Sequence, residues 1–316
     1  MTYRGRFAPS PTGELHIGSA ATAIFAYAAA LANRGRFILR IEDLDRERVV
    51  GGMAEQHMRD LVWLGVRWDE GPNCGGPSAP YEQSQRVDAY EAALQVLAER
   101  GLLYFCDCSR AEIARVASAP HVGEEGPRYP GLCREFGLAP RSFRRPPAVR
   151  LAVPDGETGR VEFDDGVMGH VAEDVGAQAG DFVLRRGDGV FAYQFAVVVD
   201  DLAMGVSEVV RGADLLASTA RQVLLARVLG ATPPRFAHVP LVVGHAGARL
   251  AKRDGGITLR DQQHRGTKAS DLVRAVTAAY GIELGEVRSG RIFEALAEAL
   301  DWSRMGRDAV EITEIV

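Results

Sequence analysis

One stretch of the chain decides its fold: Arg6-Phe7-Ala8-Pro9-Ser10-Pro11-Thr12-Gly13-Glu14-Leu15-His16-Ile17-Gly18-Ser19. Residues 4–8 form a short strand-like segment, which the prolines and Gly13 end. Residues 19–33 are rich in alanine and favour a helix, and residues 37–41 are apolar enough for a second strand. A strand, a loop, a helix and a strand in this order open a doubly wound, mostly parallel α/β nucleotide-binding domain.

The remaining pattern predicts a second domain inserted into the first. Helical patterns occupy residues 53–64 and 87–99, and the segment that follows is rich in proline, glycine and cysteine, with a strand at 148–153. Strand-like runs return at 181–184, 195–199 and 239–243, around a helix at 213–228, and the chain is helical from about 270. We therefore expect four parts: a first catalytic half at 1–101, an inserted domain at 102–180, a second catalytic half at 181–260 and a helical C-terminal region at 261–316.

Composition excludes several classes of protein. The net charge is −5, which does not indicate general nucleic-acid binding. The longest apolar stretch, residues 20–32, is too short to span a membrane, and the first residues do not resemble a secretory signal. A cytoplasmic protein is the expectation, and nothing demands more than a monomer. A local concentration of arginines is either a solvated loop or an RNA-binding surface: Arg134, Arg141, Arg144, Arg145 and Arg150.

The loop before the predicted first helix has the character of a phosphate site. Backbone N–H groups and the helix dipole favour anions there, and Gly13 and Gly18 permit a close approach to the backbone. His16 can donate a hydrogen bond to a phosphate, although a lone histidine here also fits a structural role. Downstream, Arg249-Leu250-Ala251-Lys252-Arg253 follows a predicted strand, and Lys252 suits a clamp on a triphosphate. Taken alone, this second segment also fits an ordinary basic turn.

Together the two segments resemble the His-Ile-Gly-His and Lys-Met-Ser-Lys-Ser signatures of class I aminoacyl-tRNA synthetases. Two further segments, Arg40-Ile41-Glu42-Asp43-Leu44-Asp45 and Trp63-Leu64-Gly65-Val66-Arg67-Trp68-Asp69-Glu70-Gly71-Pro72, resemble the glutamyl branch of that family. The chain departs from the general signatures at Ser19, a replacement usual in the glutamyl branch, and at Arg249 and Ala251. The resemblance implies a Rossmann-type catalytic fold with an inserted zinc-containing α+β domain and a short helical C-terminal region.

The resemblance also implies how the substrates are held. It assigns ATP to Pro9, Thr12, Gly13, His16, Gly18 and Lys252, with His16 and Lys252 catalytic and Mg²⁺ bridging the phosphates. It assigns L-glutamate to Arg6, Ala8, Ser10, Glu42, Tyr193 and Arg211. Arginine suits a carboxylate because its planar fork makes two parallel hydrogen bonds. Each pocket residue also has a structural alternative: Tyr193 in the core, Glu42 as a helix cap, and Arg211 paired with Asp214.

Three of the four cysteines cluster in sequence and predict a metal site. Cys106, Cys108 and Cys133 supply three thiolates, and a structural zinc ion needs four ligands. Short members of the family complete the set with a tyrosine, which points to Tyr129, whereas His121 is the rival on chemical grounds. Three buried free thiols are the alternative without metal. Cys74 lies in a distant glycine-rich loop and is not expected to take part.

The acceptor is the remaining question. About 60 residues follow Arg253, fewer than the anticodon-binding region of full-length glutamyl-tRNA synthetases. The segment Arg211-Gly212-Ala213-Asp214-Leu215 resembles instead the short glutamyl-queuosine tRNA(Asp) synthetases, which join glutamate to queuosine in the anticodon stem-loop. We therefore expect tRNA-independent activation of glutamate followed by transfer to queuosine. The alternatives are an ordinary glutamyl-tRNA synthetase, an inactive tRNA-binding paralogue and a small-molecule nucleotidylyltransferase.

Overall fold

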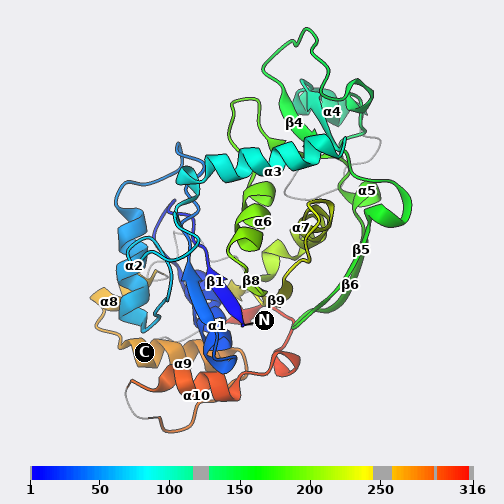
Figure 1. Ribbon diagram of the computed structural model, residues 1–316. Helices are drawn as coiled ribbons and strands as arrows, with labels where there is room; N and C mark the ends of the chain where they lie inside the picture. The colour runs from blue at the N-terminus through cyan, green and yellow to red at the C-terminus, as the bar shows by residue number, and fades with distance from the viewer. Residues whose placement is uncertain (1, 117–127, 245–257, 288–289, 313–316) are drawn as a thin grey trace.

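The computed structural model describes residues 2–116, 128–244, 258–287 and 290–312 (Figure 1). The first part contains β1 (Arg4–Phe7), α1 (Ile17–Ala32), β2 (Arg36–Leu39), α2 (Met53–Leu64) and α3 (Val87–Glu99). The middle contains β3 (Leu103–Cys106), α4 (Arg110–Val116), β4 (Ala148–Leu151), β5 (Arg160–Asp165), β6 (Gly169–Asp174), α5 (Val175–Gln178) and β7 (Phe182–Arg185). The last part contains α6 (Tyr193–Ala203), β8 (Glu208–Gly212), α7 (Leu216–Val228), β9 (Arg235–Val239), β10 (Val242–Val243), α8 (Leu259–His264), α9 (Ala269–Ala279), α10 (Ile292–Ala299) and β11 (Val310–Glu311).

Two parallel strand pairs form the centre of the nucleotide-binding fold. β1 pairs with β2, and β8 pairs with β9. β1 lies beside β8, where the Ser207 N–H donates to the Arg4 carbonyl at 2.9 Å. β9 also takes β5 as a parallel neighbour at one residue pair, and β6 extends β5 in the antiparallel sense. The described strands form two adjacent sheets, β1-β2 and β6-β5-β9-β8, which are mostly parallel with an antiparallel edge, and the mixed α/β expectation is confirmed.

Strand pairing crosses the boundary expected at residue 180. β7 contains residues expected to begin the second catalytic half, but it pairs with β4 in the antiparallel sheet β3-β4-β7. Conversely β5, expected in the inserted domain, joins β9 of the catalytic sheet. Composition marks a change of character along the chain, whereas strand ladders join segments that are remote in sequence. The division into domains at residues 101, 180 and 260 stays a prediction. At residue 180 the pairing of β7 with β4 and of β5 with β9 runs across the expected boundary.

The prediction of a strand at 195–199 is wrong, because these residues lie in the helix α6. The run Phe195-Ala196-Val197-Val198-Val199 is buried at every position, and a short apolar run does not distinguish a buried strand from a buried helix. The strand expected at 239–243 is split by Pro240 and Leu241 into β9 and β10. The helix in place of a strand matters for the site, since it carries Asp200 and Asp201 into the interior.

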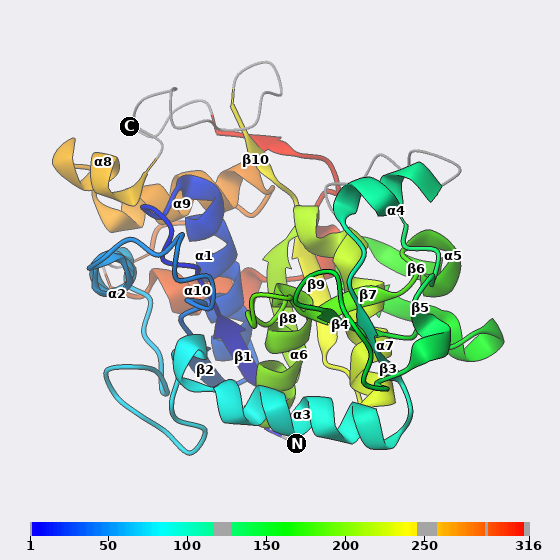
Figure 2. The same ribbon diagram turned by 90° about the horizontal axis from the view of Figure 1, so that it is seen from above.

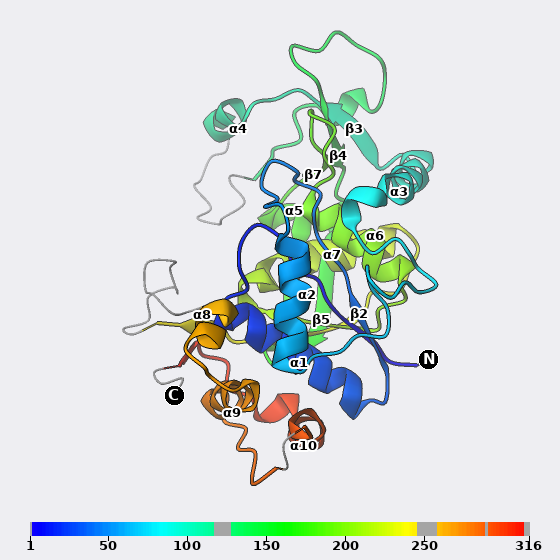
Figure 3. The ribbon, with the colours of Figure 1, turned by 90° about the vertical axis from the view of Figure 1, so that its left-hand side faces the viewer.

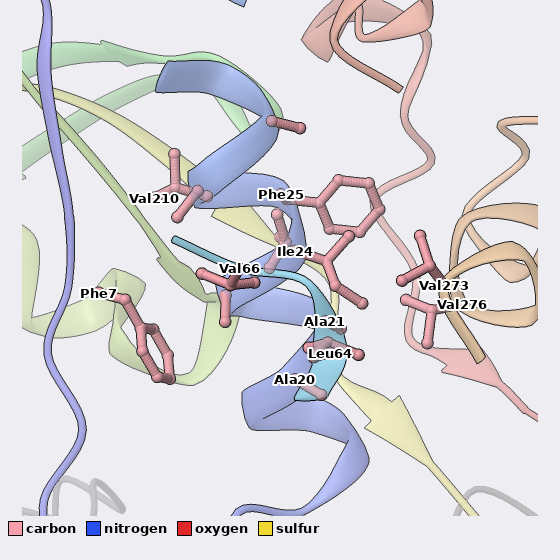
Figure 4. Packing of buried hydrophobic residues seen from close by; sticks show 14 of the residues in the cluster. Phe7, Ala20, Ala21, Ile24, Phe25, Leu64, Val66, Val210, Val273 and Val276 are labelled. Carbon is pink, nitrogen blue, oxygen red and sulfur yellow. The ribbon is translucent and has the colours of Figure 1, made fainter. Parts of the chain in front are cut away.

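α1 is the central helix of the core. Alanine favours its helical state, and ten of its sixteen residues are buried, so that sheet and helices cover it on several sides. Figure 4 shows Ile24 and Phe25 of α1 between Val210 of β8 and the α9 residues Val273 and Val276. At its end, a Cβ on Gly35 would lie 2.5 Å from the Tyr3 carbonyl oxygen, so only glycine lets the chain turn back to β2 here.

The described elements form a long body with the antiparallel sheet at one end. β3, β4 and α4 lie at one end, and α9 and α10 lie at the other, with α1 and α2 between them (Figure 3). Seen from above, β3, β4 and β7 are on the opposite side from α8 and α9 (Figure 2). Among the described residues, no helix is both long and apolar enough to cross a bilayer. The cytoplasmic location stays a prediction.

Candidate active site

The loop between β1 and α1 turns three of its carbonyl groups into the protein. These oxygens accept hydrogen bonds from Glu42 N–H to Pro9 (3.0 Å), from Val50 N–H to Pro11 (2.9 Å) and from the His57 ring to Gly13 (2.7 Å). His57 is buried on α2, and sequence reasoning missed it. Hydrogen bonds from Glu42, Val50 and His57 therefore hold this loop in place. It contains Pro9, Thr12 and Gly13, which were expected to bind ATP.

His16 caps the first turn of α1. Its Nδ1 accepts from the Ser19 N–H at 3.3 Å, which leaves the hydrogen of the neutral ring on Nε2. A Cβ on Gly18 would lie 3.1 Å from this Nδ1, so the glycine allows the ring to fold back over the helix start. Desolvation lowers the pKa of His16, although Asp214 opposes the shift. The ring is thus neutral near pH 7, and its Nε2–H lies 3.2 Å from Ser19 Oγ, so a phosphate would replace that hydroxyl as its acceptor.

Lys252 lies outside the described residues, as do Arg249 and Ala251. The described chain stops at Gly244, just after β10, and is described again at Thr258, which forms an isolated bridge with His16. The Leu259 N–H then donates to the Leu15 carbonyl at 2.8 Å. The described chain therefore resumes beside His16 of the first expected signature.

Four residues expected to bind glutamate come together from four segments. Arg6 lies on β1, Glu42 follows β2, Tyr193 begins α6 and Arg211 lies on β8. Desolvation and the charge of Glu42 raise the pKa of Tyr193, while Arg211 and Arg6 oppose the shift, so these groups act on one another electrostatically. Ala8 and Ser10 lie on the loop directly after β1, half-buried and exposed respectively.

A buried ion network connects two of these segments with the start of the sheet. Arg40 is completely buried, and its guanidinium contacts Asp201 at 2.7 Å, Glu42 at 3.2 Å and Asp200 at 3.8 Å. Burial would raise the pKa of Asp201, but Arg40 and Arg6 outweigh burial and the pKa lies below its ordinary value. Burial does raise the pKa of Glu42 despite the same two arginines. Glu42 is thus the carboxylate of this network that lacks sufficient positive charge.

Asp200 extends the network to α3 and to the segment before it. It accepts from Arg86 at 2.6 Å, from Gln83 at 2.7 Å and from the Tyr90 hydroxyl at 2.9 Å. None of these three residues was singled out in the sequence, because nothing local marks an arginine or tyrosine that pairs with a carboxylate more than 100 positions away.

Arg211 is buried without a carboxylate partner. Its Nε donates to His238 Nε2 at 3.0 Å, and its Nη2 donates to Thr219 Oγ1 at 2.8 Å. Its Nη1 has no hydrogen-bond partner among the described residues. It makes no ion pair with any of them, so the structural pairing with Asp214 is not present. A buried guanidinium with an unused amino group is an anion-binding element.

Cys106, Cys108 and Cys133 form a compact cluster. Their three sulfur atoms lie within 4.8 Å of one another. The Tyr129 hydroxyl lies among them, 3.4 Å from Cys106 Sγ and 3.7 Å from Cys108 Sγ. Arg150 lies 4.0 Å above the Tyr129 ring, and its charge helps to lower the pKa of Cys106, whereas burial raises that of Cys108 to about 11. This group could hold a metal ion. His121 lies outside the described residues, and Cys74 is exposed elsewhere.

The arginine-rich segment does not present free positive charge. Arg141 and Arg144 contact Asp107, and Arg134 pairs with Asp181. Arg145 contacts Glu112, and the buried Arg150 donates to the Asp181 carbonyl at 3.0 Å. All five arginines therefore have partners within the middle part of the chain, which favours a structural role over an RNA-binding surface.

The histidine-capped loop after β1 and the cluster of opposed charges around Arg6, Glu42 and Arg211 thus lie within one α/β fold. Residues 2–290 match the family described as tRNA synthetases class I (E and Q), catalytic domain. The chain belongs to this family of class I aminoacyl-tRNA-synthetase ligases. The expected enzyme class is confirmed.

Individual relatives show which branch of the family this chain is most similar to in sequence and length. A glutamyl-Q tRNA(Asp) synthetase from Symbiobacterium thermophilum is 47% identical over 98% of this chain and 95% of its own length. A glutamate–tRNA ligase from a Sulfurihydrogenibium species is 41% identical over 81% of this chain but 54% of its own length. The crystal structure of a glutamate–tRNA ligase from Elizabethkingia meningosepticum, in complex with its amino acid, superposes with a TM-score of 0.81 at 27% identity, covering 99% of this chain and 67% of that one. The expected resemblance to the short glutamyl-Q branch is confirmed.

The buried network predicts a large difference between two arginines. Arg40→Met should destabilise the fold by about 3–5 kcal/mol, because it leaves buried carboxylates without their cation. Arg36→Met, at an exposed pair with Asp69, should change stability by at most about 1 kcal/mol. Chemical unfolding followed by circular dichroism measures both. Equal losses in the two variants would show that the network does not stabilise the fold.

Proposed function

We propose that this chain activates L-glutamate with ATP and transfers the glutamyl group to queuosine in the anticodon stem-loop of tRNA(Asp). The observation that carries the choice of amino acid is Arg211, whose buried guanidinium has only neutral partners and an unused Nη1. An acidic side chain would supply the missing negative charge and accept two parallel hydrogen bonds. A neutral or basic side chain would leave that charge uncompensated.

The opposite end of the pocket suits the α-amino group. Burial raises the pKa of Glu42, and an ammonium group beside it would lower that pKa and favour the ionised form. Tyr193 is about one third exposed at the start of α6, where its hydroxyl can contact a ligand that lies between Glu42 and Arg211. In this proposal Arg6, Ala8 and Ser10 complete the wall from the side of β1.

The proposed chemistry needs no covalent enzyme intermediate. The α-carboxylate of glutamate attacks the α-phosphorus of ATP in line, a new P–O bond forms, and pyrophosphate leaves. An acceptor hydroxyl then attacks the carbonyl carbon of the adenylate, loses its proton and displaces AMP. The chain positions the reactants and stabilises charge: Pro9, Thr12, Gly13 and Gly18 shape the ATP loop, His16 donates from Nε2, and Lys252 clamps the phosphates. Mg²⁺ enters with ATP and neutralises its phosphate charge.

The acceptor rests on the relatives. Relatives named glutamyl-Q tRNA(Asp) synthetase match this chain at 46–52% identity and over most of their own length. Those named glutamate–tRNA ligase match at 41–42% identity and over 54–55% of theirs. The same hydroxyl-transfer chemistry serves both acceptors, so the distinction has to come from a transfer assay.

The proposed acceptor predicts selective labelling. With radiolabelled glutamate and ATP, label should enter tRNA(Asp) that contains queuosine and should not enter the same tRNA with guanine at that position. Removal of the 3′-terminal adenosine should leave this transfer unchanged, because the acceptor hydroxyls are in the anticodon loop. Label on the 3′ end of tRNA(Glu) would instead identify an ordinary glutamyl-tRNA synthetase, and label on neither tRNA would favour an inactive paralogue.

His16 offers a test of the activation step. His16→Ala should lower glutamate-dependent ATP–pyrophosphate exchange, measured without tRNA, by at least about tenfold, because a donor to the reacting phosphates is lost. His264→Ala removes an exposed histidine from the last turn of α8 and should leave exchange unchanged. Exchange at the normal rate in His16→Ala would remove this residue from the mechanism, and strict dependence on tRNA would count against independent activation.

We further propose that the thiol cluster is a structural zinc site. Zinc–sulfur bonds of about 2.3 Å in a tetrahedron place the sulfur ligands about 3.8 Å apart. Cys108 Sγ and Cys133 Sγ are 3.7 Å apart, and the Tyr129 hydroxyl lies at a similar distance from two of the sulfurs. Cys106, Cys108, Tyr129 and Cys133 would therefore close the coordination sphere, and the ion would hold β3 to the segment around Cys133.

This site predicts one zinc ion per chain after purification without chelators. Cys133→Ser should lose most of the metal and lower the thermal midpoint, because the site joins two segments 25 residues apart. Cys74→Ser alters an exposed thiol outside the cluster and should retain the full zinc content. Elemental analysis of the wild type and of the two variants measures the zinc content of each. Wild-type protein without metal would exclude the zinc site.

A further inference from the structure

A buried chain of hydrogen bonds reaches Arg211 from behind the pocket. Asp165, at the end of β5, accepts from His238 Nδ1 on β9 at 2.5 Å. His238 Nε2 in turn accepts from Arg211 Nε on β8 at 3.0 Å. All three residues are buried, and the two bonds cross three neighbouring strands. Neither Asp165 nor His238 was marked by any sequence motif, and neither lies in the expected pocket.

The protonation states of this chain follow from its geometry. The Asp165 carboxylate is held in place, since Oδ1 accepts from the backbone N–H groups of Val167, Met168 and His238 at 2.9–3.1 Å. Oδ2 is left for the histidine, so the ring hydrogen must lie on Nδ1. Nε2 is then a lone-pair acceptor that faces both Arg211 Nε and the Thr219 hydroxyl, each at 3.0 Å. Burial lowers the pKa of His238, which keeps the ring neutral although Asp165 favours its charged form.

A neutral acceptor at this position solves a specific problem. A carboxylate in direct contact with Arg211 would occupy the guanidinium edge that a ligand carboxylate needs. The imidazole instead fixes Nε, and the Thr219 hydroxyl fixes Nη2. The charge of Asp165 is separated from Arg211 by the His238 ring. Arg211 also lies 5.4 Å from the Phe236 ring centroid, which lowers the cost of burying its charge without using a hydrogen atom.

We propose that Asp165 and His238 are positioning residues that orient Arg211 toward the side-chain carboxylate of the amino-acid substrate and so determine its selection. This inference rests on the proposed function, because it takes Arg211 as the reader of that carboxylate. It assigns a role in substrate selection to the β5–β6 hairpin, which otherwise extends the sheet away from the pocket.

Asp165→Asn tests the orientation of the histidine directly. The asparagine keeps the volume, and its Oδ1 can still accept the three backbone N–H groups. Its amide group would donate to His238 Nδ1, which moves the ring hydrogen to Nε2 and places two donors face to face at Arg211 Nε. The KM for glutamate in ATP–pyrophosphate exchange should rise about tenfold or more, while the KM for ATP changes less than twofold.

Two substitutions of His238 separate positioning from packing. His238→Gln can keep an acceptor oxygen near the place of Nε2, and the KM for glutamate should stay within about threefold of the wild-type value. His238→Leu fills the space without an acceptor, and the KM for glutamate should rise about tenfold or more. In Asp165→Asn and His238→Leu the preference for glutamate over glutamine should also fall, since a misplaced guanidinium no longer distinguishes a carboxylate from an amide.

An exposed pair on the same hairpin provides the matched control. His170 contacts Asp164 at 2.9 Å on the surface of β5 and β6. Asp164→Asn and His170→Gln should leave both KM values and the glutamate preference unchanged. Equal effects in the exposed and buried pairs would indicate a general disturbance of the hairpin and overturn the inference.

A measurement on the unaltered protein keeps the inference testable if a buried variant does not fold. Nitrogen NMR of labelled wild-type protein, with the His238 signal assigned from the His238→Gln spectrum or by selective sequential labelling, should show a neutral ring with its hydrogen on Nδ1. A hydrogen on Nε2 or a charged ring near pH 7 would overturn the inference, as would unchanged glutamate KM in both buried variants. Absence of any glutamate-dependent exchange in the wild type would instead refute the proposed function itself.

Discussion

The contact between Arg40 and three carboxylates is the constraint on which the rest of the site depends. A completely buried guanidinium is tolerated because Asp201, Glu42 and Asp200 surround it. Two of these partners lie on α6, more than 150 residues away, so β2 and α6 must assemble before the charge is compensated. Asp200 also accepts from Arg86 and Tyr90, which brings α3 into the same unit. The halves of the nucleotide-binding fold are therefore joined by charge as well as by apolar packing.

The two buried arginines, Arg40 and Arg211, show how one side-chain type serves structure or recognition. Arg40 has carboxylate partners on several sides, so its positive charge needs no further anion from a ligand. Arg211 has a histidine, a threonine hydroxyl and an aromatic ring as neighbours, which fix its position but leave its charge unmatched. The neighbours of a buried arginine therefore determine whether it stabilises the fold or is left to bind a ligand. Glu42 is the complementary case, a carboxylate whose raised pKa marks a deficit of positive charge.

The middle part of the chain has two different relations to the pocket. Its antiparallel sheet, with the thiol cluster on the adjoining segments, lies at the end of the molecule remote from α9 and α10 (Figure 1). The β5–β6 hairpin instead joins β9 at Asp165 and reaches the pocket through His238. The arginines between these regions pair with Asp107, Glu112 and Asp181, so their charge holds the middle part together.

The sequence by itself determined the features that are local along the chain. Proline and glycine placed the loop before α1, alanine predicted α1, the spacing of Cys106 and Cys108 marked the thiol cluster, and several motifs in order identified the family. It failed where the deciding contact is remote: the apolar run at 195–199 became a buried helix, and strand pairing crossed residue 180. Asp165 and His238 carry no local signal, and the motif that contains Arg40 does not reveal its partners, because the role of a buried charge depends on its neighbours in space. Only the tertiary structure brings those neighbours together.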